Sequence, residues 1–237
     1  KKSKQKKDKK MTEQEFSHQI ETIAKKDANK LAVFEKNLLA IVATYSAPLA
    51  KKLLEINTNE RFNLYTGKDP IDINIIAADG SRYMYENPVS DVEKQLESFE
   101  KAYSGYKALF IYGLGNGVLL KGILGNPAHS TTVVFEPEIE IIYIVLHLID
   151  FSTEITDSRL VIFQTDVMEF THYHSIVGLK DVLSCARLYS LYIISPFYER
   201  YTSDMSLINE NMTKAFMQHL RMAGNDGTDS MIGVNHT

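Results

Sequence analysis

The spacing of apolar and polar residues divides the chain into three parts. In the first part, up to about residue 54, apolar residues recur every three or four positions, which is typical of amphipathic helices. A Thr12–Glu15 capping box begins the first of them. The pattern predicts helices over residues 12–26, over a segment capped by Asp27, and over residues 49–54.

The second part, residues 61–86, has short runs of β-prone residues around Asp79-Gly80. This pair is typical of hairpin turns, so a small antiparallel sheet is expected here. Tyr65, Tyr83 and Tyr85 lie in it, and aromatic residues in such a sheet more often pack across strands than stack on a ligand. A Ser90–Glu93 capping box then predicts a charged helix over residues 91–103.

In the third part, from residue 107, continuous apolar runs alternate with helical patterns. Strands are predicted over residues 107–112, 131–135, 159–163 and 188–194, and helices over residues 118–124, 137–149 and 205–222. This alternation implies a parallel sheet with right-handed crossovers. The predicted class is α/β, with a basic disordered tail (1–10), an N-terminal α+β domain (11–103) and a domain with a parallel sheet flanked by helices (104–237).

A glycine-rich turn is the most specific local signal. Gly113, Gly115 and Gly117 lie between a predicted strand and a predicted helix, where the missing Cβ lets backbone N–H groups approach a ligand. Glu136 follows 19 residues after Gly117, at the end of the next strand, where an acid can bind a ribose hydroxyl. We interpret this as half of a Rossmann-like nucleotide-binding fold, with candidate binding residues Gly113, Gly115, Asn116, Gly117 and Glu136.

The glycine spacing leaves the ligand open. G-x-G-x-G is one residue tighter than the dinucleotide fingerprint and is closer to adenosylmethionine and related nucleotide sites. Plain packing of a helix on a strand is the alternative.

Other candidates have equally good structural explanations. Asp166, after the third strand, can reach a base or ribose from the same edge of the sheet, or cap a helix. The segment 195–200 (SPFYER) can line a pocket or form a proline turn. Asp226, Asp229 and Ser230 lie in a turn-rich closing segment that can bind phosphate or a divalent ion, or can simply be a turn before a helix cap.

Composition and charge limit the kinds of partner and the compartment that we expect for this protein. The chain has 237 residues and a net charge of -4, but its first ten residues carry seven Lys and one Asp, so the remainder is distinctly acidic. An acidic body argues against a nucleic-acid duplex as the main partner. No apolar run reaches the ~20 residues that span a bilayer. The single Cys185 and the absence of a signal-peptide pattern favour a cytoplasmic protein without a membrane span.

Several separate motifs resemble the motility accessory factor family of flagellated bacteria. They are YGLGNGVLLKGILGN, VVFEPEIEIIYIVLHLIDFS, IISPFYERYTSDM and GNDGTDSMIGVNH, with TGKDP and YENP in the N-terminal part. The resemblance covers nearly everything after Met11.

That resemblance implies a flagellin glycosyltransferase. Such a protein transfers a nonulosonic acid, pseudaminic or legionaminic, from its CMP-activated form to Ser or Thr of flagellin. It further implies that the glycine turn and Glu136 hold the nucleotide, and that Asp226, Asp229 and Ser230 lie near the sugar or phosphate. Asp226 or His236 is the candidate general base. For His236 the simpler interpretation is a histidine exposed to solvent near the end of the chain. A need for a divalent metal is left open.

Family chains continue past the segment in which this one stops, so we expect a fragment whose sheet lacks its last strands and whose activity is reduced or lost. Two alternative functions remain. One is a non-catalytic module that binds flagellin, and the other is an adenosylmethionine-dependent methyltransferase.

Overall fold

The computed structural model describes residues 10–56 and 59–234, with the side chains of the last helix described up to residue 222. Its first helices are α1 (Glu13–Ala24), α2 (Val33–Thr44) and α3 (Ala47–Glu55). The predicted capping box of Thr12 and Glu15 is confirmed. The predicted cap of the second helix is wrong. Asp27 instead caps a 3₁₀ turn, η1 (Ala28–Lys30), because its side chain accepts a hydrogen bond from the nearby Asn29 N–H.

The small antiparallel sheet is present, but its two strands are not the pair that was expected on either side of Asp79-Gly80. Its strands are β1 (Phe62–Thr66) and β2 (Ile73–Ala77). Gly80 does form a turn, with φ +69° and its N–H donating to Ala77 O. The strand expected after that turn is reduced to one bridge between Ile76 and Tyr83. The chain leaves the ladder there because the consecutive residues Met84 and Tyr85 are both buried in the core.

The main sheet has parallel strands in the order β5-β4-β3-β6. The strands are β3 (Ala108–Tyr112), β4 (Thr131–Glu136), β5 (Leu160–Gln164) and β6 (Leu191–Ile193). Every residue of β3 and β4 is buried, which explains their continuous apolar runs. The predicted α/β class with a parallel sheet is confirmed, although β6 is shorter than predicted.

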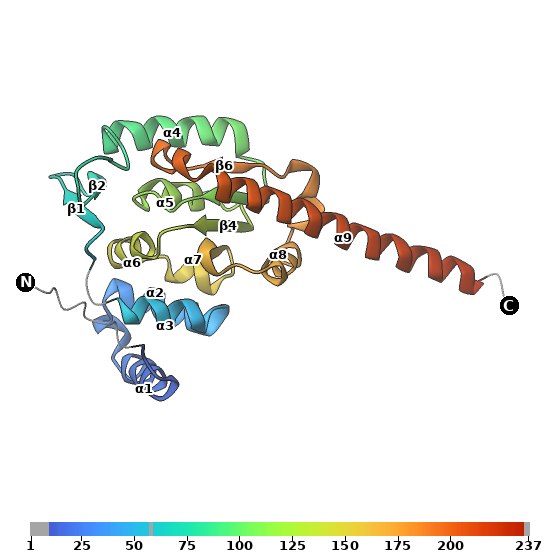
Figure 1. Ribbon diagram of the computed structural model, residues 1–237, viewed down its shortest axis with the longest axis horizontal. Coiled ribbons are helices and arrows are strands. Elements are labelled where there is room, and N and C mark those ends of the chain that lie inside the picture. Colours follow the sequence, from blue (N-terminus) through green and yellow to red (C-terminus); the bar gives the residue numbers. More distant parts are fainter. Residues whose placement is uncertain (1–9, 57–58, 235–237) are drawn as a thin grey trace, which may run out of the picture.

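Helices cover this sheet from both faces (Figure 1). They are α4 (Pro88–Tyr103), α5 (Val118–Leu124), α6 (Ile139–Leu148), α7 (Ser152–Thr156), α8 (Phe170–Val177) and α9 (Thr202–Val234), with 3₁₀ turns η2 (Thr165–Val167), η3 (Leu183–Leu188) and η4 (Pro196–Tyr201). On one side α5 packs against α4, where Gly122 lies under Leu96. On the other, α9 packs against α8, and its Phe216 contacts Phe110 of β3.

The predicted start of α4 is wrong. The helix begins at Pro88, in the first-turn position that suits a residue without an N–H, and not after a Ser90–Glu93 box. The Asp91 side chain accepts a hydrogen bond from the Asn87 N–H at 2.9 Å, which fixes the chain just before the helix.

The last helix is longer than predicted. α9 continues to Val234, through the glycines and Asx residues that we expected to form a turn-rich segment. An interior glycine costs a helix only about 1 kcal/mol relative to alanine, so propensity alone sets no boundary there. In Figure 1 the second half of α9 extends away from the sheet.

One hydrophobic core includes residues from both predicted domains. The buried Asn37 of α2 adds a polar link, because its side chain donates to Leu146 O and Ile149 O, both at 2.8 Å. The domain boundary near residue 104 therefore stays a prediction from the pattern, while packing joins the two parts. Among the described residues, we find no helix with both the length and the apolar character that crossing a bilayer requires.

Candidate functional site at the carboxyl ends of the strands

The chain order places the candidate site between β3 and β6. From β3 the chain adds β4 and β5 on one side and then returns to add β6 on the other. Ligands of open α/β sheets bind at such a switch point, beyond the carboxyl ends of the strands. Here that edge carries the glycine turn after β3, Glu136 at the end of β4, and Ser195 with η4 after β6.

The glycine turn needs its glycines for their backbone angles. Gly113, Gly115 and Gly117 have φ of +90°, +61° and +82°, a region that side chains rarely adopt. The predicted strand, glycine turn and helix are thus confirmed.

The same turn is filled by neighbouring side chains. A Cβ at Gly113 would lie 2.2 Å from the Tyr198 ring, and one at Gly115 would lie 2.6 Å from the Tyr85 hydroxyl. At Gly117 a Cβ would meet side chains of α6 and the residue after it at 2.8 Å. In this structure the missing Cβ atoms make room for protein side chains.

The N–H groups of the turn are also paired within the protein. Leu114 N donates to Glu136 Oε2 at 2.8 Å, Gly115 N to the Tyr198 hydroxyl at 3.3 Å, and Gly117 N to Leu114 O at 3.0 Å. In this structure the N–H groups of Gly115 and Gly117 are engaged within the protein, and their binding of a nucleotide stays a prediction.

Asn116 is likewise engaged within the fold. Its buried side chain donates to Ile73 O of β2 at 2.8 Å and accepts a hydrogen bond from Val118 N at 3.0 Å. It therefore joins the glycine turn to the small sheet and to the start of α5.

Glu136 faces the turn, as expected, and holds it. The carboxylate is fully buried and also accepts hydrogen bonds from the Tyr198 hydroxyl at 2.7 Å and from Glu138 N at 2.9 Å. Burial raises the pKa of Glu136 to about 8, although these hydrogen bonds favour the ionised form. Burial, and next the charge of Glu136, raise the pKa of Tyr198 well above its usual range.

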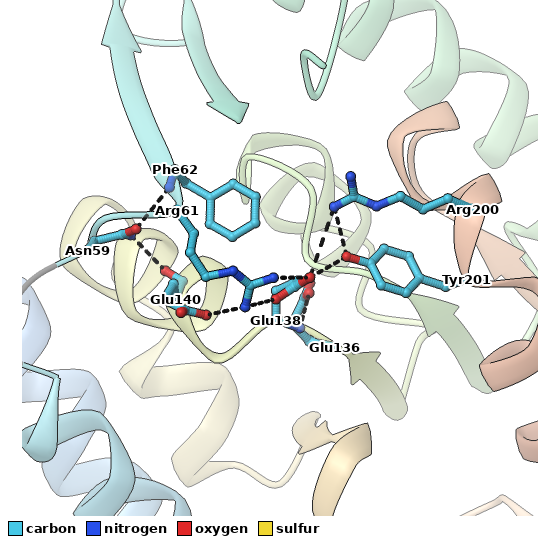
Figure 2. Close-up of polar contacts among 8 residues, drawn as sticks. All are labelled: Asn59, Arg61, Phe62, Glu136, Glu138, Glu140, Arg200 and Tyr201. Carbon is cyan, nitrogen blue, oxygen red and sulfur yellow. Dashed lines mark hydrogen bonds and ion pairs between the residues drawn. The ribbon is translucent and has the colours of Figure 1, made fainter. Parts of the chain in front are cut away.

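A second polar cluster surrounds Glu138, just outside Glu136 (Figure 2). Glu138 is almost buried and forms an ion pair with Arg61 at 2.6 Å, while Arg61 also reaches Glu140 at 3.3 Å. Arg200 lies 4.0 Å from Glu138, and the Tyr201 hydroxyl donates to the same carboxylate. Arg61 precedes β1, so this cluster fastens the N-terminal part to the carboxyl edge of the main sheet.

Local geometry explains the cluster. Glu138 is the residue before α6, which begins at Ile139 and not at the predicted Pro137. A helix N-terminus favours carboxylates because of its exposed N–H groups. Burial alone would lower the pKa of Arg61, but the hydrogen bond and charge of Glu138 raise it above its ordinary value. Arg61 therefore stays charged in this position.

A cavity of about 520 Å³ opens next to the turn, between residues 81–86, the first half of α4 and the start of η4. Tyr85 separates the cavity from the glycine turn, since it lines the cavity and its hydroxyl approaches Gly115. The polar and aromatic residues of the wall include Arg82, Tyr83, Glu86, Asp91, Lys94 and Gln95.

The remaining predicted residues lie away from the turn or outside the described part. Asp166 is exposed in η2, after β5, and β4 separates β5 from β3. The backbone positions of Asp226, Asp229 and Ser230 are in α9, but their side chains are not among those described, and His236 lies outside the described residues. The proposed roles of all five residues stay predictions.

Sequence reasoning missed the residues that fill and surround the turn. Tyr85 was assigned to cross-strand packing, and neither Arg61 nor Glu138 was singled out. The segment 195–200 did give a signal, since both alternatives hold: it forms a 3₁₀ turn, and its Pro196 and Phe197 line the cavity.

The fold and the position of this edge define the class as an open α/β sheet with a polar, aromatic crevice at its switch point. The fold is similar to the structure of the MAf glycosyltransferase from Magnetospirillum magneticum AMB-1, with a TM-score of 0.51 and 14% sequence identity. The match covers 77% of this chain and 35% of that chain. At this level of sequence identity, the comparison shows a fold that the two proteins share.

No protein-family model matches the sequence. No curated protein matches it either.

Proposed function

We propose that this chain is a glycosyltransferase of the motility accessory factor type. Its donor is a CMP-activated nonulosonic acid, and its acceptors are Ser or Thr hydroxyls of flagellin in the cytoplasm. One observation carries the proposal: the fold is similar to that of the MAf glycosyltransferase. The family-like motifs support it, because the glycine turn and the SPFYER segment meet at the edge of the sheet where ligands of this class bind.

Transfer from a CMP donor breaks the bond between the anomeric carbon and the phosphate. It needs a base for the acceptor hydroxyl and hydrogen-bond donors for the departing phosphate. Asp226 and His236 are proposed for the base, with Asp229 and Ser230 near the sugar or phosphate. Glu136 is a poor candidate for the base, because it is fully buried and both of its oxygens already accept hydrogen bonds.

The closed turn sets a condition on nucleotide binding. The Tyr198 hydroxyl donates to Glu136 and accepts from Gly115 N–H, which are the contacts assigned to a nucleotide. Nucleotide binding by Gly113, Gly115, Asn116, Gly117 and Glu136 therefore requires that Tyr198 move away. Otherwise the donor binds beside the turn.

Calorimetric titration with CMP is the first test, followed by incubation with a CMP-nonulosonate and purified flagellin and mass spectrometry of the flagellin. The proposal predicts saturable CMP binding and a mass increase of one sugar per modified hydroxyl. Adenosylmethionine is the comparison ligand. If adenosylmethionine binds and CMP does not, a methyltransferase replaces the glycosyltransferase.

The packed glycine turn favours a second candidate, a flagellin-binding module without catalysis. This candidate predicts that the immobilised protein retains flagellin. It also predicts that calorimetric titration with CMP gives no binding heat and that no sugar is transferred to flagellin. Gly115→Val is a poor variant for this test, because the new side chain would meet the Tyr85 hydroxyl at a positive φ and would destabilise the fold itself. Flagellin retained with concurrent transfer would contradict the non-catalytic candidate.

A further inference from the structure

We propose that the cavity between residues 81–86, α4 and η4 binds a hydroxylated ring that carries one anionic group. This chemistry is found in the nucleotide part of a donor and in an acidic sugar. The inference rests on the proposed function for the origin of the ligand, but the cavity residues themselves carry the argument.

Hydrogen bonds fix the segment 81–86, which lines the cavity, to β2 and to the end of β6. Ala77 N donates to Arg82 O at 2.9 Å and Met84 N to Ile75 O at 2.8 Å, which attach this segment to β2. On the other side, the Tyr85 hydroxyl donates to Ile194 O at 3.3 Å, next to the carboxyl end of β6. The segment is therefore positioned by the small sheet and the main sheet together.

Two cations at the cavity are available to an anion. Arg82 and Lys94 make no side-chain hydrogen bond or ion pair with any other described residue, apart from a weaker Coulombic effect of Arg82 on Asp79. This sets them apart from Arg61, which forms ion pairs with two carboxylates. Two unpaired cations that line one cavity suit a phosphate or a carboxylate.

The cavity also contains two carboxylates, Glu86 and Asp91. One Asp91 oxygen accepts a hydrogen bond from Asn87 N, and Glu86 is exposed. Carboxylates repel a bare phosphate but accept hydrogen bonds from hydroxyls. The mixture of two cations and two carboxylates therefore favours a ligand with several hydroxyls and one anionic group over inorganic phosphate.

An aromatic ring and a free amide oxygen complete the set. Tyr83 is 56% exposed, and its backbone is held by the bridge to Ile76. Its exposed ring can therefore stack on a ligand ring. Gln95 Oε1 is buried and has no hydrogen-bond partner. A buried acceptor without a partner costs about 1–3 kcal/mol, so a rotation of the Gln95 side chain toward a ligand N–H or O–H in the cavity would remove that cost.

The volume is adequate for such a ligand. About 520 Å³ lies within the range of roughly 300–1,000 Å³ that small-molecule sites occupy. Pro196 and Phe197 also line the cavity, so the ligand would contact both the N-terminal part and the segment after β6.

The test compares binding of two probes, CMP and free N-acetylneuraminic acid, to the whole chain by saturation-transfer NMR and calorimetry. The variants are Arg82→Ala, Tyr83→Ala and Gln95→Leu. Their matched controls are Tyr65→Ala, an exposed tyrosine of the same small sheet, and Lys101→Ala, a lysine of α4 that does not line the cavity. Unfolding midpoints check that every variant folds.

We expect Arg82→Ala and Tyr83→Ala each to weaken binding about tenfold, and the controls to bind as the wild type does. The probe whose binding weakens in these variants shows whether the cavity binds the nucleotide or the acidic sugar. If CMP binds and the variants leave its Kd unchanged, the cavity inference is wrong and the glycosyltransferase proposal stands. If only the free sugar binds and the variants lose it, the inference stands without the CMP donor. If the wild type binds neither probe, both are overturned.

Discussion

The glycine turn and the neighbouring cavity share Tyr85 as a wall, yet they differ in the state of their polar groups. In the turn, the carboxylate of Glu136 and the N–H groups of Leu114 and Gly115 are paired with each other or with Tyr198. In the cavity, Arg82 and Lys94 form no ion pair with the described residues, and Gln95 Oε1 has no partner.

This difference indicates which groups are free for a ligand. A buried hydrogen bond that already exists must be broken before a ligand can replace it, whereas an unpaired group gains a partner on binding. The motif that best matches nucleotide-binding patterns therefore stabilises the fold here, and less conspicuous residues offer the binding chemistry. Three changes would test that division, from the largest expected effect on stability to the smallest.

Gly113→Ala should have the largest effect. The new Cβ would lie 2.2 Å from the buried Tyr198 ring at a φ of +90°, so strain and overpacking should together lower the free energy of unfolding by about 2–5 kcal/mol. Gly105→Ala is the matched control, because a Cβ there meets nothing within 4 Å. Urea unfolding measures both. Equal stability of the two variants would show that Tyr198 does not occupy the turn.

Tyr198→Phe removes the hydroxyl while keeping the ring. Gly115 N loses its acceptor and Glu136 loses a donor, so we expect a loss of about 1–3 kcal/mol in the free energy of unfolding. Tyr65→Phe, at an exposed position, is the control and should change little. If CMP binding strengthens in Tyr198→Phe, the hydroxyl competes with the nucleotide, and the turn becomes a ligand site after all.

The pH dependence of stability comes last because its effect is the smallest for a single pH unit. Glu136 has a pKa of about 8 in the folded protein and near 4.5 when unfolded, so the folded state keeps a proton that the unfolded state has lost. Its contribution is fully present below pH 4.5 and is lost as the pH rises to about 8, by at most about 1.4 kcal/mol per unit.

Glu136→Gln cannot ionise, so its unfolding free energy, measured in urea between pH 5 and 8.5, should lack this slope relative to the wild type. Glu97→Gln, in an exposed pair on α4, is the control and should keep the slope. Parallel curves for the wild type and Glu136→Gln would mean that the carboxylate stays ionised, as its hydrogen bonds alone would favour.

The local pattern was a good guide to the main sheet and a poorer one to the N-terminal part. Predicted strands match β3, β4 and β5 closely because each is a continuous apolar run buried on both sides. The residues after Asp79-Gly80 were assigned to a strand wrongly, since their alternation ends where Met84 and Tyr85 turn into the core. That outcome depends on which surface the segment meets.

What the sequence by itself determined is local: a strand, a glycine turn with positive φ and a helix over residues 108–124, with an acid at the end of the next strand. Backbone sterics and apolar period suffice for that, because both act within a few residues. Only the tertiary structure decided what fills the turn. Tyr198 is 83 residues from Gly115, and such a contact depends on how distant segments pack, which no local pattern records.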